Sequence, residues 1–341
     1  MGWEKWASFV GLVIVNVCLS LLISLSKSSG HTYTYNPASA ITIAEVVKML
    51  MSMTSYWREK DASDDVKSYF SLKFILSYFS LAVMYCLNNQ LTFVILSMTN
   101  PGNLTLFKAS TPLMTAMLQW MLFGVPLSKL RWACVIILCT GLVLTQWNDC
   151  NMSLHIKAEA LLALVFSVLL TSISSVLNAS AIQSFSSVPL NVHNFTLYFF
   201  GAILNANTYL LASAGIININ SDAGFFQGYN NVYALLVVFL NSVIGIVITL
   251  LYKYGDAIIK CFAQVISSIA LVMLSVFLFD YTLTVSSLCG CVSVFVASYI
   301  YLILSPQIEI QRESKHQEQK SETETQKLLN SEESDDDGEE V

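Results

Sequence analysis

Four ionisable side chains interrupt long apolar stretches of this sequence, where a charge is costly to bury. Glu45 and Lys48 stand three residues apart, so they share one face of a helix. Lys108 has no acidic residue within a helical turn, and Lys260 stands one turn into an apolar stretch, where a helix N-terminus favours anions. An ionisable residue inside a membrane span is a candidate functional residue. The lysines therefore predict a site for an anion such as phosphate.

Each of these residues also has an explanation that needs no ligand. Glu45 and Lys48 can neutralise each other, which lowers the cost of burying both. Lys108 and Lys260 can extend their ammonium groups to a membrane surface. Thr111 lies near the same face as Lys108, and this hydroxyl favours the phosphate hypothesis there.

Neutral polar side chains cluster in other apolar stretches and could recognise a base and sugar hydroxyls. The clusters include Tyr85, Asn88, Asn89, Tyr229 and Asn241. Hydrogen bonds between helices, worth about 0.6 kcal/mol each on average, are the simpler explanation for any single one of them.

Signatures of enzymes and of nucleic-acid binding are absent from the sequence. It contains no Walker A loop, no G-x-G-x-x-G and no H-E-x-x-H. Its four histidines are scattered, and all of its eight cysteines except Cys150 lie in apolar stretches. This pattern predicts neither a metal site nor a disulfide framework. We therefore expect no enzyme activity, no cofactor and no nucleic-acid partner.

The composition identifies the elements that must hold these residues. The chain is 55% hydrophobic and 12% charged, whereas soluble domains carry about 25% charged residues. A membrane-spanning helix needs about 20 apolar residues. Ten such runs occur, near 6–26, 38–57, 72–95, 102–123, 132–147, 158–182, 195–214, 231–252, 257–279 and 284–304. Backbone groups in lipid must pair internally, so we expect an all-α polytopic membrane protein of ten transmembrane helices.

The ten runs divide into two halves, about 1–150 and 151–305, of one transporter domain over residues 1–305. An odd number of spans per half inserts the second half with the opposite orientation, the plan of inverted-repeat transporters. Lys and Arg concentrate in alternate connections, which predicts that both termini are cytosolic. Asn151, in an Asn-Met-Ser sequon, then becomes a lumenal glycosylation candidate.

Residues 306–341 differ in composition from the rest of the chain. They include 12 acidic and 4 basic residues, a net charge of −8, so we expect a cytosolic, acidic and disordered tail. Glu324, Leu328 and Leu329 fit an acidic dileucine sorting motif of the kind that clathrin adaptors bind. Ser331 and Ser334 stand beside acidic residues and are phosphorylation candidates. An unselected polar tail is the alternative.

Several segments, taken in order, resemble motifs of the nucleotide-sugar transporters of the drug/metabolite transporter superfamily. They are Ala44–Lys48, Tyr85–Leu91, the segments that begin at Ser110 and Leu130, Gly224–Tyr229 and Lys253–Phe262. The resemblance spans roughly residues 5–305. It implies an antiporter of the Golgi or ER that brings a nucleotide sugar into the lumen and returns the nucleoside monophosphate.

The resemblance also implies roles for residues that the charge pattern singles out. In the family, the lysine at the position of Lys260 contacts phosphate. The residues that match Glu45 and Lys48 line the site, and those that match Asn88 and Asn89 face the nucleotide.

Departures from the family pattern bear on the substrate. Thr111 stands at the position of the fourth-helix lysine, and Lys108, one turn earlier on the same face, could substitute for it. Ala257 replaces an asparagine, and His193 replaces an arginine. These changes speak against CMP-sialic acid or UDP-galactose. Asn194–Gly201, Phe279-Asp280 and the tail rich in Ser, Asp and Glu resemble the UDP-sugar transporter branch of the family's A subfamily.

We therefore expect a pyrimidine nucleotide-sugar transporter, preferentially for UDP-sugars, that works by alternating access between its halves. One rival hypothesis is a drug/metabolite carrier for another small organic anion. The other is a non-transporting membrane scaffold that acts through its tail. The expected partners are the nucleotide sugar, the nucleoside monophosphate and the lipid bilayer, and a homo-oligomer stays open. The expected location is the Golgi membrane, with the ER or endosomal and lysosomal membranes as alternatives.

Overall fold

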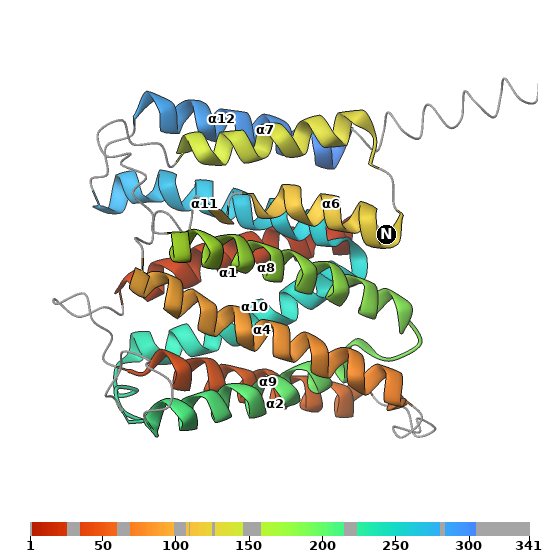
Figure 1. Ribbon diagram of the computed structural model, residues 1–341, viewed down its shortest axis with the longest axis vertical. Helices are drawn as coiled ribbons and strands as arrows, with labels where there is room; N and C mark the ends of the chain where they lie inside the picture. Colours follow the sequence, from red (N-terminus) through yellow and green to blue (C-terminus); the bar gives the residue numbers. More distant parts are fainter. Residues whose placement is uncertain are drawn as a thin grey trace, which may run out of the picture.

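Long apolar stretches of the sequence form the helices of the structure, a computed structural model (Figure 1). It describes residues 2–25, 35–59, 69–98, 107–108, 110–124, 127–145, 158–214, 224–279 and 284–304. The helices are α1 (Gly2–Leu25), α2 (Pro37–Glu59), α4 (Leu72–Met98), α6 (Thr111–Phe123), α7 (Lys129–Thr145), α8 (Ala158–Ser184), α9 (Leu190–Ser213), α10 (Val232–Tyr254), α11 (Ala257–Phe279), α12 (Val285–Tyr299) and the π-helix η1 (Ile300–Leu304). All regular secondary structure in these described ranges is helical.

Most of the helices follow the predicted apolar runs closely, whereas α6 begins at Thr111 and its predicted run begins at 102. The helix α11 has the predicted bounds 257–279, and α8 and α10 differ from theirs by a few residues. The helix α9 begins at Leu190, before the apolar run at 195, because the extended Pro189 precedes it and ends the turn that follows α8. The helix α6 begins at Thr111, and its Pro112 lacks an N–H that the first helical turn leaves unpaired in any case.

Side-chain caps fix where the later helices begin. Asn231 accepts a hydrogen bond from the N–H of Tyr233 at 2.9 Å at the start of α10, and Thr284 accepts one from Ser287 at 3.1 Å at the start of α12. Asp256 Oδ1 accepts from the N–H of Ile259 at 2.7 Å before the first turn of α11. These bonds satisfy N–H groups that have no partner within the helix. The cap at Asp256 also sets the register of α11.

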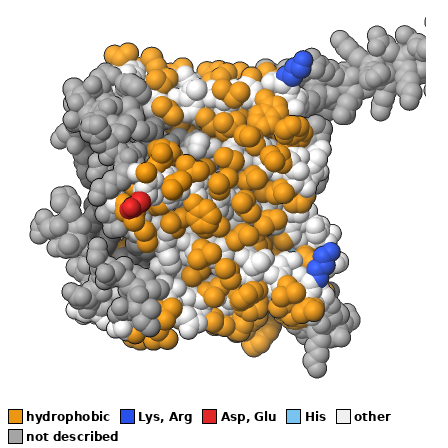
Figure 2. Space-filling view, viewed as in Figure 1, with side chains coloured by type: hydrophobic (Ala, Val, Ile, Leu, Met, Phe, Trp, Pro, Cys, Tyr) orange, Lys and Arg blue, Asp and Glu red, His pale blue; other side chains and the backbone are white. Residues whose placement is uncertain are grey.

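The outer surface of the bundle is apolar over the length of its helices. Figure 2 shows one face on which hydrophobic side chains predominate, with basic side chains at one margin and an acidic one at the other. Among the described residues, five helices are long and apolar enough to cross a membrane by length and composition: Trp3–Leu22, Ala158–Ser184, Leu190–Ser213, Val232–Tyr254 and Val285–Ile303. These features are those of a multi-pass membrane protein.

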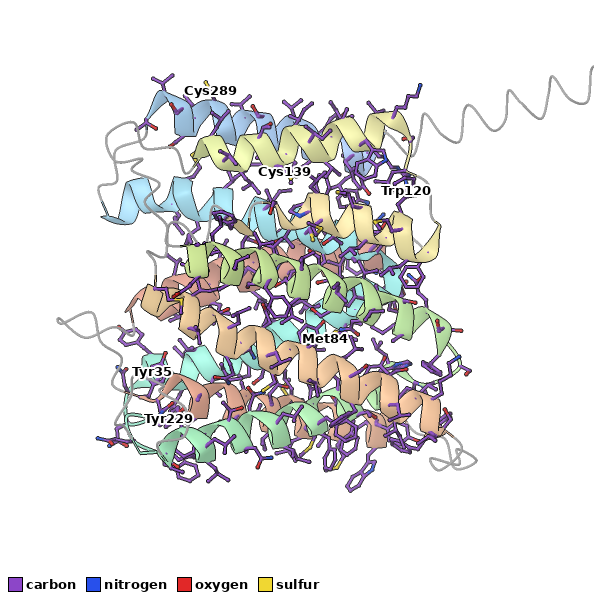
Figure 3. All side chains as sticks on the ribbon, viewed as in Figure 1. Tyr35, Met84, Trp120, Cys139, Tyr229 and Cys289 are labelled. Carbon is purple, nitrogen blue, oxygen red and sulfur yellow. The ribbon has the colours of Figure 1, made fainter. Side chains whose placement is uncertain are left out.

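Helices that lie far apart in the sequence pack against each other. The helix α2 packs on α9, α7 on α12, α1 on α10 and α11, α4 on α8 and α9, and α6 on α8 and α11. One core cluster joins α1, α6, α7, α10, α11 and α12, with Leu12, Leu138 and Phe262 fully buried. A second joins α2, α4, α8 and α9 around Phe74 and Tyr78. Figure 3 shows how side chains fill the layers between the helices.

Some predicted features lie outside the described residues. They are the glycosylation candidate Asn151 and the whole tail 306–341, with Glu324, Leu328, Leu329, Ser331 and Ser334.

Candidate functional site

Two neighbouring cavities inside the bundle contain most of the polar residues that the sequence singles out. The first, here called the lysine cavity, has a volume of about 380 Å³. It is lined by Tyr85, Asn88, Lys108, Thr111, Pro112, Leu142, Thr171, Ser174, Lys260, Cys261, Gln264, Val265 and Ser268. The second, here called the amide cavity, has a volume of about 310 Å³ and includes Glu45, Lys48, Tyr85, Asn89, Asn178, Tyr198, Asn205, Asn241 and Lys260 in its lining. Tyr85 and Lys260 line both cavities, so they mark the boundary between the two.

Lys260 lies in the first turn of α11, which the cap at Asp256 holds in place. Its side chain is 6% exposed, and its Nζ donates to Ser175 Oγ at 3.0 Å. The ammonium group also lies 5.8 Å from the centroid of the Tyr252 ring. Within the part of the chain that the structure describes, no carboxylate pairs with Lys260. A hydroxyl and an aromatic face stabilise this cation without neutralising it.

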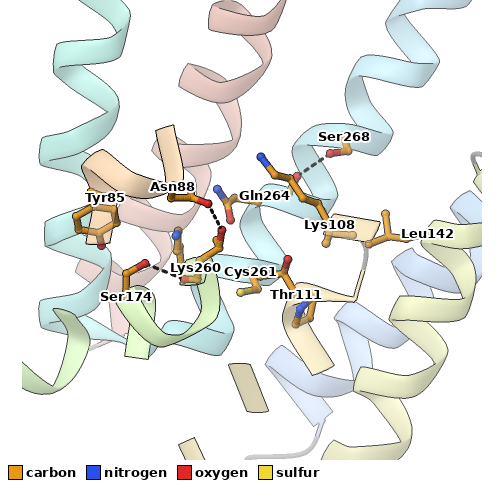
Figure 4. Close-up of a pocket in the computed structure, with 13 residues that line it drawn as sticks. Tyr85, Asn88, Lys108, Thr111, Leu142, Ser174, Lys260, Cys261, Gln264 and Ser268 are labelled. Atoms are coloured by element: carbon orange, nitrogen blue, oxygen red, sulfur yellow. Dashed lines mark hydrogen bonds between the residues drawn. The ribbon is translucent and has the colours of Figure 1, made fainter. Parts of the chain in front are cut away.

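Lys108 enters the lysine cavity from the segment before α6 (Figure 4). Among the described residues, no acidic side chain lines this cavity and Lys108 has no ion-pair partner. Asn88 occupies the opposite wall, where its Oδ1 accepts hydrogen bonds from Ser167 and Thr171, each at 3.1 Å. The lysine cavity therefore presents two ammonium groups among hydroxyl and amide side chains.

Glu45 and Lys48 form an ion pair at the amide cavity, with Lys48 Nζ 2.5 Å from Glu45 Oε1. Their side chains are 15% and 11% exposed, and Lys48 Nζ lies 4.7 Å from the centroid of the Tyr198 ring. The charges of Glu45 and Lys48 thus cancel, and Lys260 stands at the boundary with the lysine cavity. The sequence allowed two interpretations, a pair that only neutralises itself and a pair that also contacts a ligand. The position of the pair in the cavity lining agrees with both interpretations.

Two glycines make room for this ion pair. A Cβ atom at Gly245 would lie 2.6 Å from Lys48 Cδ and 2.8 Å from the Tyr198 hydroxyl. A Cβ atom at Gly201 would lie 2.9 Å from Glu45 Oε2. Real Cβ contacts are longer than these distances, so α9 and α10 can approach the pair only through glycine.

A polar stripe on α8 was not part of the predicted site. Thr171 and Ser174 line the lysine cavity, Asn178 lines the amide cavity, and Ser175 holds Lys260. These positions recur every three or four residues, so the helical period was the signal that could have identified them. Tyr198 and Asn205 on α9 also line the amide cavity, and the sequence did not predict either as a site residue.

Tyr229 is the predicted site residue that the structure places apart from the two cavities. Its hydroxyl lies 2.9 Å from Ser39 Oγ, and its ring packs on Tyr35 with centroids 5.9 Å apart. Figure 3 shows Tyr35 and Tyr229 together at one end of the bundle, opposite the end that bears Trp120. The turn at Gly228, with φ of 89°, directs this segment toward the start of α2. Tyr229 therefore packs one end of the bundle.

His193 also has a packing environment rather than a place in either cavity. Its Nδ1 hydrogen-bonds with the Tyr78 hydroxyl, and its Nε2 donates to the carbonyl of Phe185 at 3.1 Å. The ring packs against Phe74 with centroids 5.3 Å apart. In the sequence this residue replaces an arginine of the family pattern, and in the structure it joins α9 to α4.

A helical bundle with an apolar outer belt and two adjoining polar cavities defines a class: multi-pass membrane proteins with an internal polar site. The sequence profile described as "Nucleotide-sugar transporter" matches residues 4–302. The chain belongs to the nucleotide-sugar transporter family, whose members are transporters and not enzymes.

Individual relatives are distant in sequence but match over most of their length. The CMP-sialic acid transporter 2 of Oryza sativa subsp. indica is 25% identical over 302 residues, which cover 87% of this chain and 83% of that protein. The probable UDP-sugar transporter protein SLC35A4 of Xenopus tropicalis is 25% identical over 292 residues, which cover 82% of this chain and 86% of that protein. A solved crystal structure matches 91% of this chain and 100% of its own with a TM-score of 0.64 at 14% identity, which supports the fold alone.

Proposed function

We propose that this protein exchanges a cytosolic pyrimidine nucleotide sugar, preferentially a UDP-sugar, for a lumenal nucleoside monophosphate. The observation that carries the proposal is the pair of uncompensated ammonium groups, Lys108 and Lys260, in the lysine cavity. No acidic residue in the part of the chain that the structure describes lines that cavity. A buried charge without a partner is costly, so its natural complement is an anion that enters from outside.

The charge of the lysine cavity matches both exchange partners. A phosphate monoester carries about −1.5 to −2 charges near neutral pH, as in a nucleoside monophosphate. The diphosphate of a nucleotide sugar carries a similar charge. Either ligand would neutralise Lys108 and Lys260, whereas the empty cavity leaves both unpaired. This asymmetry favours exchange over movement of the empty carrier.

The packing pattern supports two related halves. If α1, α2, α4, α6 and α7 correspond in order to α8, α9, α10, α11 and α12, the contacts map onto each other. The contact of α1 with α10 then matches that of α8 with α4, and α1 with α11 matches α8 with α6. The contact of α2 with α10 matches that of α9 with α4, while α2–α9, α6–α11 and α7–α12 map onto themselves. Such a pattern is expected of a pseudo-two-fold axis that relates ten spans as inverted repeats.

Alternating access follows from this arrangement. The cavities lie between the two halves, because α4 and α6 line them from one half and α8 and α11 from the other. Rocking of one half against the other would open the site to each side of the membrane in turn. We place this exchange in the Golgi membrane with both chain ends in the cytosol, as the distribution of lysine and arginine predicts.

Reconstituted transport tests the proposal. The purified protein in liposomes preloaded with UMP should take up radiolabelled UDP-sugars faster than in empty liposomes. We expect Lys260→Ala to reduce this uptake at least about tenfold, because a hydrogen bond to a charged group contributes about 1.5–3 kcal/mol. Lys253→Ala is the matched control, since Lys253 is an exposed lysine near the end of α10.

The same experiment distinguishes the rival hypotheses. If UMP stimulates no uptake but another small organic anion does, the protein is a carrier of a different substrate. If no anion is exchanged, the transport proposal is wrong. Competition by CMP, UMP and GMP then ranks the bases, and a preference for CMP over UMP would overturn the choice of UDP-sugars.

A further inference from the structure

Asn205 presents a buried oxygen atom that no group of the described residues satisfies. This residue lies on α9, lines the amide cavity and is 4% exposed. Its Nδ2 donates to the carbonyl of Gly201 at 2.8 Å. A carbonyl can only accept, so this bond fixes which end of the amide is nitrogen. The Oδ1 atom is therefore an acceptor, and it has no hydrogen-bond partner within the structure.

Asn241 repeats this arrangement on the neighbouring helix. It lies on α10, lines the same cavity, and its Nδ2 donates to the carbonyl of Val237 at 3.0 Å. The same reasoning assigns its Oδ1 as an acceptor. Asn205 lies one helical turn beyond Gly201 on α9, and Asn241 lies one turn before Gly245 on α10. Both glycines contact the Glu45–Lys48 pair, so the two asparagines belong to one region of the cavity next to that pair.

The amide cavity contains buried acceptor atoms that the described residues leave unsatisfied. Asn178 adds another, because its Nδ2 donates to the Tyr85 hydroxyl at 3.0 Å and its buried Oδ1 has no partner. The Lys48 ammonium is already engaged by Glu45. A buried acceptor without a partner costs about 1–3 kcal/mol. A group that enters this cavity and satisfies these oxygens should therefore carry N–H or O–H donors.

Resting on the proposed function, we propose that Asn205 and Asn241 determine specificity by accepting hydrogen bonds from donor groups of the nucleotide ligand. The anionic phosphates occupy the lysine cavity, and the donor-bearing part of the ligand enters the amide cavity past Tyr85 and Lys260. Such donors occur on the base, as the N3–H of uracil, and on the sugars, as hydroxyl groups. Both present the same chemistry to an amide oxygen.

The chain supplies a matched control for Asn205. Asn207 lies on the same helix, and its Nδ2 makes the same kind of bond, to the carbonyl of Ile203 at 2.9 Å. Its side chain is exposed and lies outside the linings of both cavities. Asn207→Leu and Asn205→Leu therefore remove the same local bond, but only Asn205→Leu removes an acceptor from the site.

Ligand binding to the purified full-length protein tests the inference. Dissociation constants are measured for UMP, N3-methyl-UMP, 2′-deoxy-UMP and UDP-glucose with the unaltered protein, Asn205→Leu, Asn241→Leu and Asn207→Leu. The unaltered protein and Asn207→Leu should bind at least one donor-bearing ligand about fivefold or more tightly than its counterpart without that donor. Asn205→Leu and Asn241→Leu should bind the donor-bearing ligand about fivefold more weakly and lose that preference.

The pattern of the loss identifies the donor. If a variant no longer discriminates against N3-methyl-UMP, the donor lies on the base. If it no longer discriminates against 2′-deoxy-UMP, the donor lies on the ribose. A selective loss of UDP-glucose affinity places the donor on the transferred sugar. If both variants keep every preference of the unaltered protein, the inference is wrong while the proposed function stands. If the unaltered protein binds none of the four ligands, both are wrong. Asn241→Leu provides an independent test should Asn205→Leu fail to fold.

Discussion

The Glu45–Lys48 ion pair allows a quantitative test of how charge is held inside the bundle. The pair is nearly buried, with its nitrogen and oxygen atoms 2.5 Å apart. We predict that removing either partner destabilises the protein far more than removing both. The variants are Glu45→Gln, Lys48→Met and the double variant, each close in volume to the residue that it replaces.

The expected magnitudes follow from what each variant leaves behind. Lys48→Met leaves the Glu45 carboxylate without a counter-charge, and breaking a buried ion pair in this way costs about 3–5 kcal/mol. Glu45→Gln leaves the Lys48 ammonium beside the Tyr198 ring, 4.7 Å from its centroid. A cation over an aromatic ring retains about 0.5–2 kcal/mol, so this variant should cost less, about 2–3 kcal/mol. The double variant leaves no charge and should cost less than either single change.

Unfolding of the purified protein in mixed micelles, followed by helical circular dichroism, measures these free energies. Lys253→Met is the control, because an exposed lysine should change the free energy of unfolding by less than about 0.5 kcal/mol. The double-variant cycle should give a coupling energy of about 2 kcal/mol or more. If the double variant costs the sum of the single variants within about 0.5 kcal/mol, the two charges are not coupled and the reasoning is refuted.

Three further predictions concern the packing at Gly245, the helix cap at Asp256 and the position of Tyr229 outside the two cavities. Gly245→Ala, whose Cβ would lie 2.6 Å from Lys48 Cδ, should lower the free energy of unfolding by about 1–3 kcal/mol, whereas Gly11→Ala, with 3.7 Å to its nearest neighbour, should not. Burial raises the pKa of Asp256 above 3.8, so increasing the pH from about 4 through the raised pKa should lower the stability of the unaltered protein. Asp256→Asn, which can still cap α11, should abolish that pH dependence, and a persistent dependence would contradict the assignment. Tyr229→Phe should leave the dissociation constant for UMP unchanged, and a weakened affinity would place Tyr229 in the site.

The lengths of the apolar runs predicted most of the helices because a membrane span must above all be apolar over the thickness of the bilayer. A run of apolar residues long enough to cross the bilayer must pair its backbone internally, and a helix is the local solution. The bounds of α11 could therefore be predicted from 257–279 alone. The beginning of α9 could not, because the four residues after Leu190 are mostly polar and are helical owing to tertiary contacts such as that of His193 with Tyr78.

The sequence predicted those site residues whose burial in a membrane costs much free energy. It did not predict those whose burial costs little. A lysine in an apolar run, such as Lys108 or Lys260, is conspicuous, and both line the same cavity. Serine and threonine are common in membrane helices because they can bond to the carbonyl one turn earlier, as Thr171 does to Ser167 at 2.7 Å. The role of Ser175 in holding Lys260 therefore had no signal apart from its spacing. Tyr229 lies in a segment that resembles a family motif, but the motif does not indicate the direction in which the turn points its side chain.

The two cavities differ in whether a carboxylate pairs with their lysines, and this difference bears on the mechanism of transport. Lys48 has a carboxylate partner supplied by its own helix, so its charge is balanced whether or not a ligand is present. Lys260 has a serine hydroxyl and an aromatic ring, which stabilise a cation but leave its charge uncompensated. A ligand anion would therefore change the electrostatic energy at Lys260 far more than at Lys48. We infer that the lysine cavity supplies the charge-dependent part of the binding energy. The part of the amide cavity around the balanced Glu45–Lys48 pair is left to discriminate among ligands by hydrogen bonding.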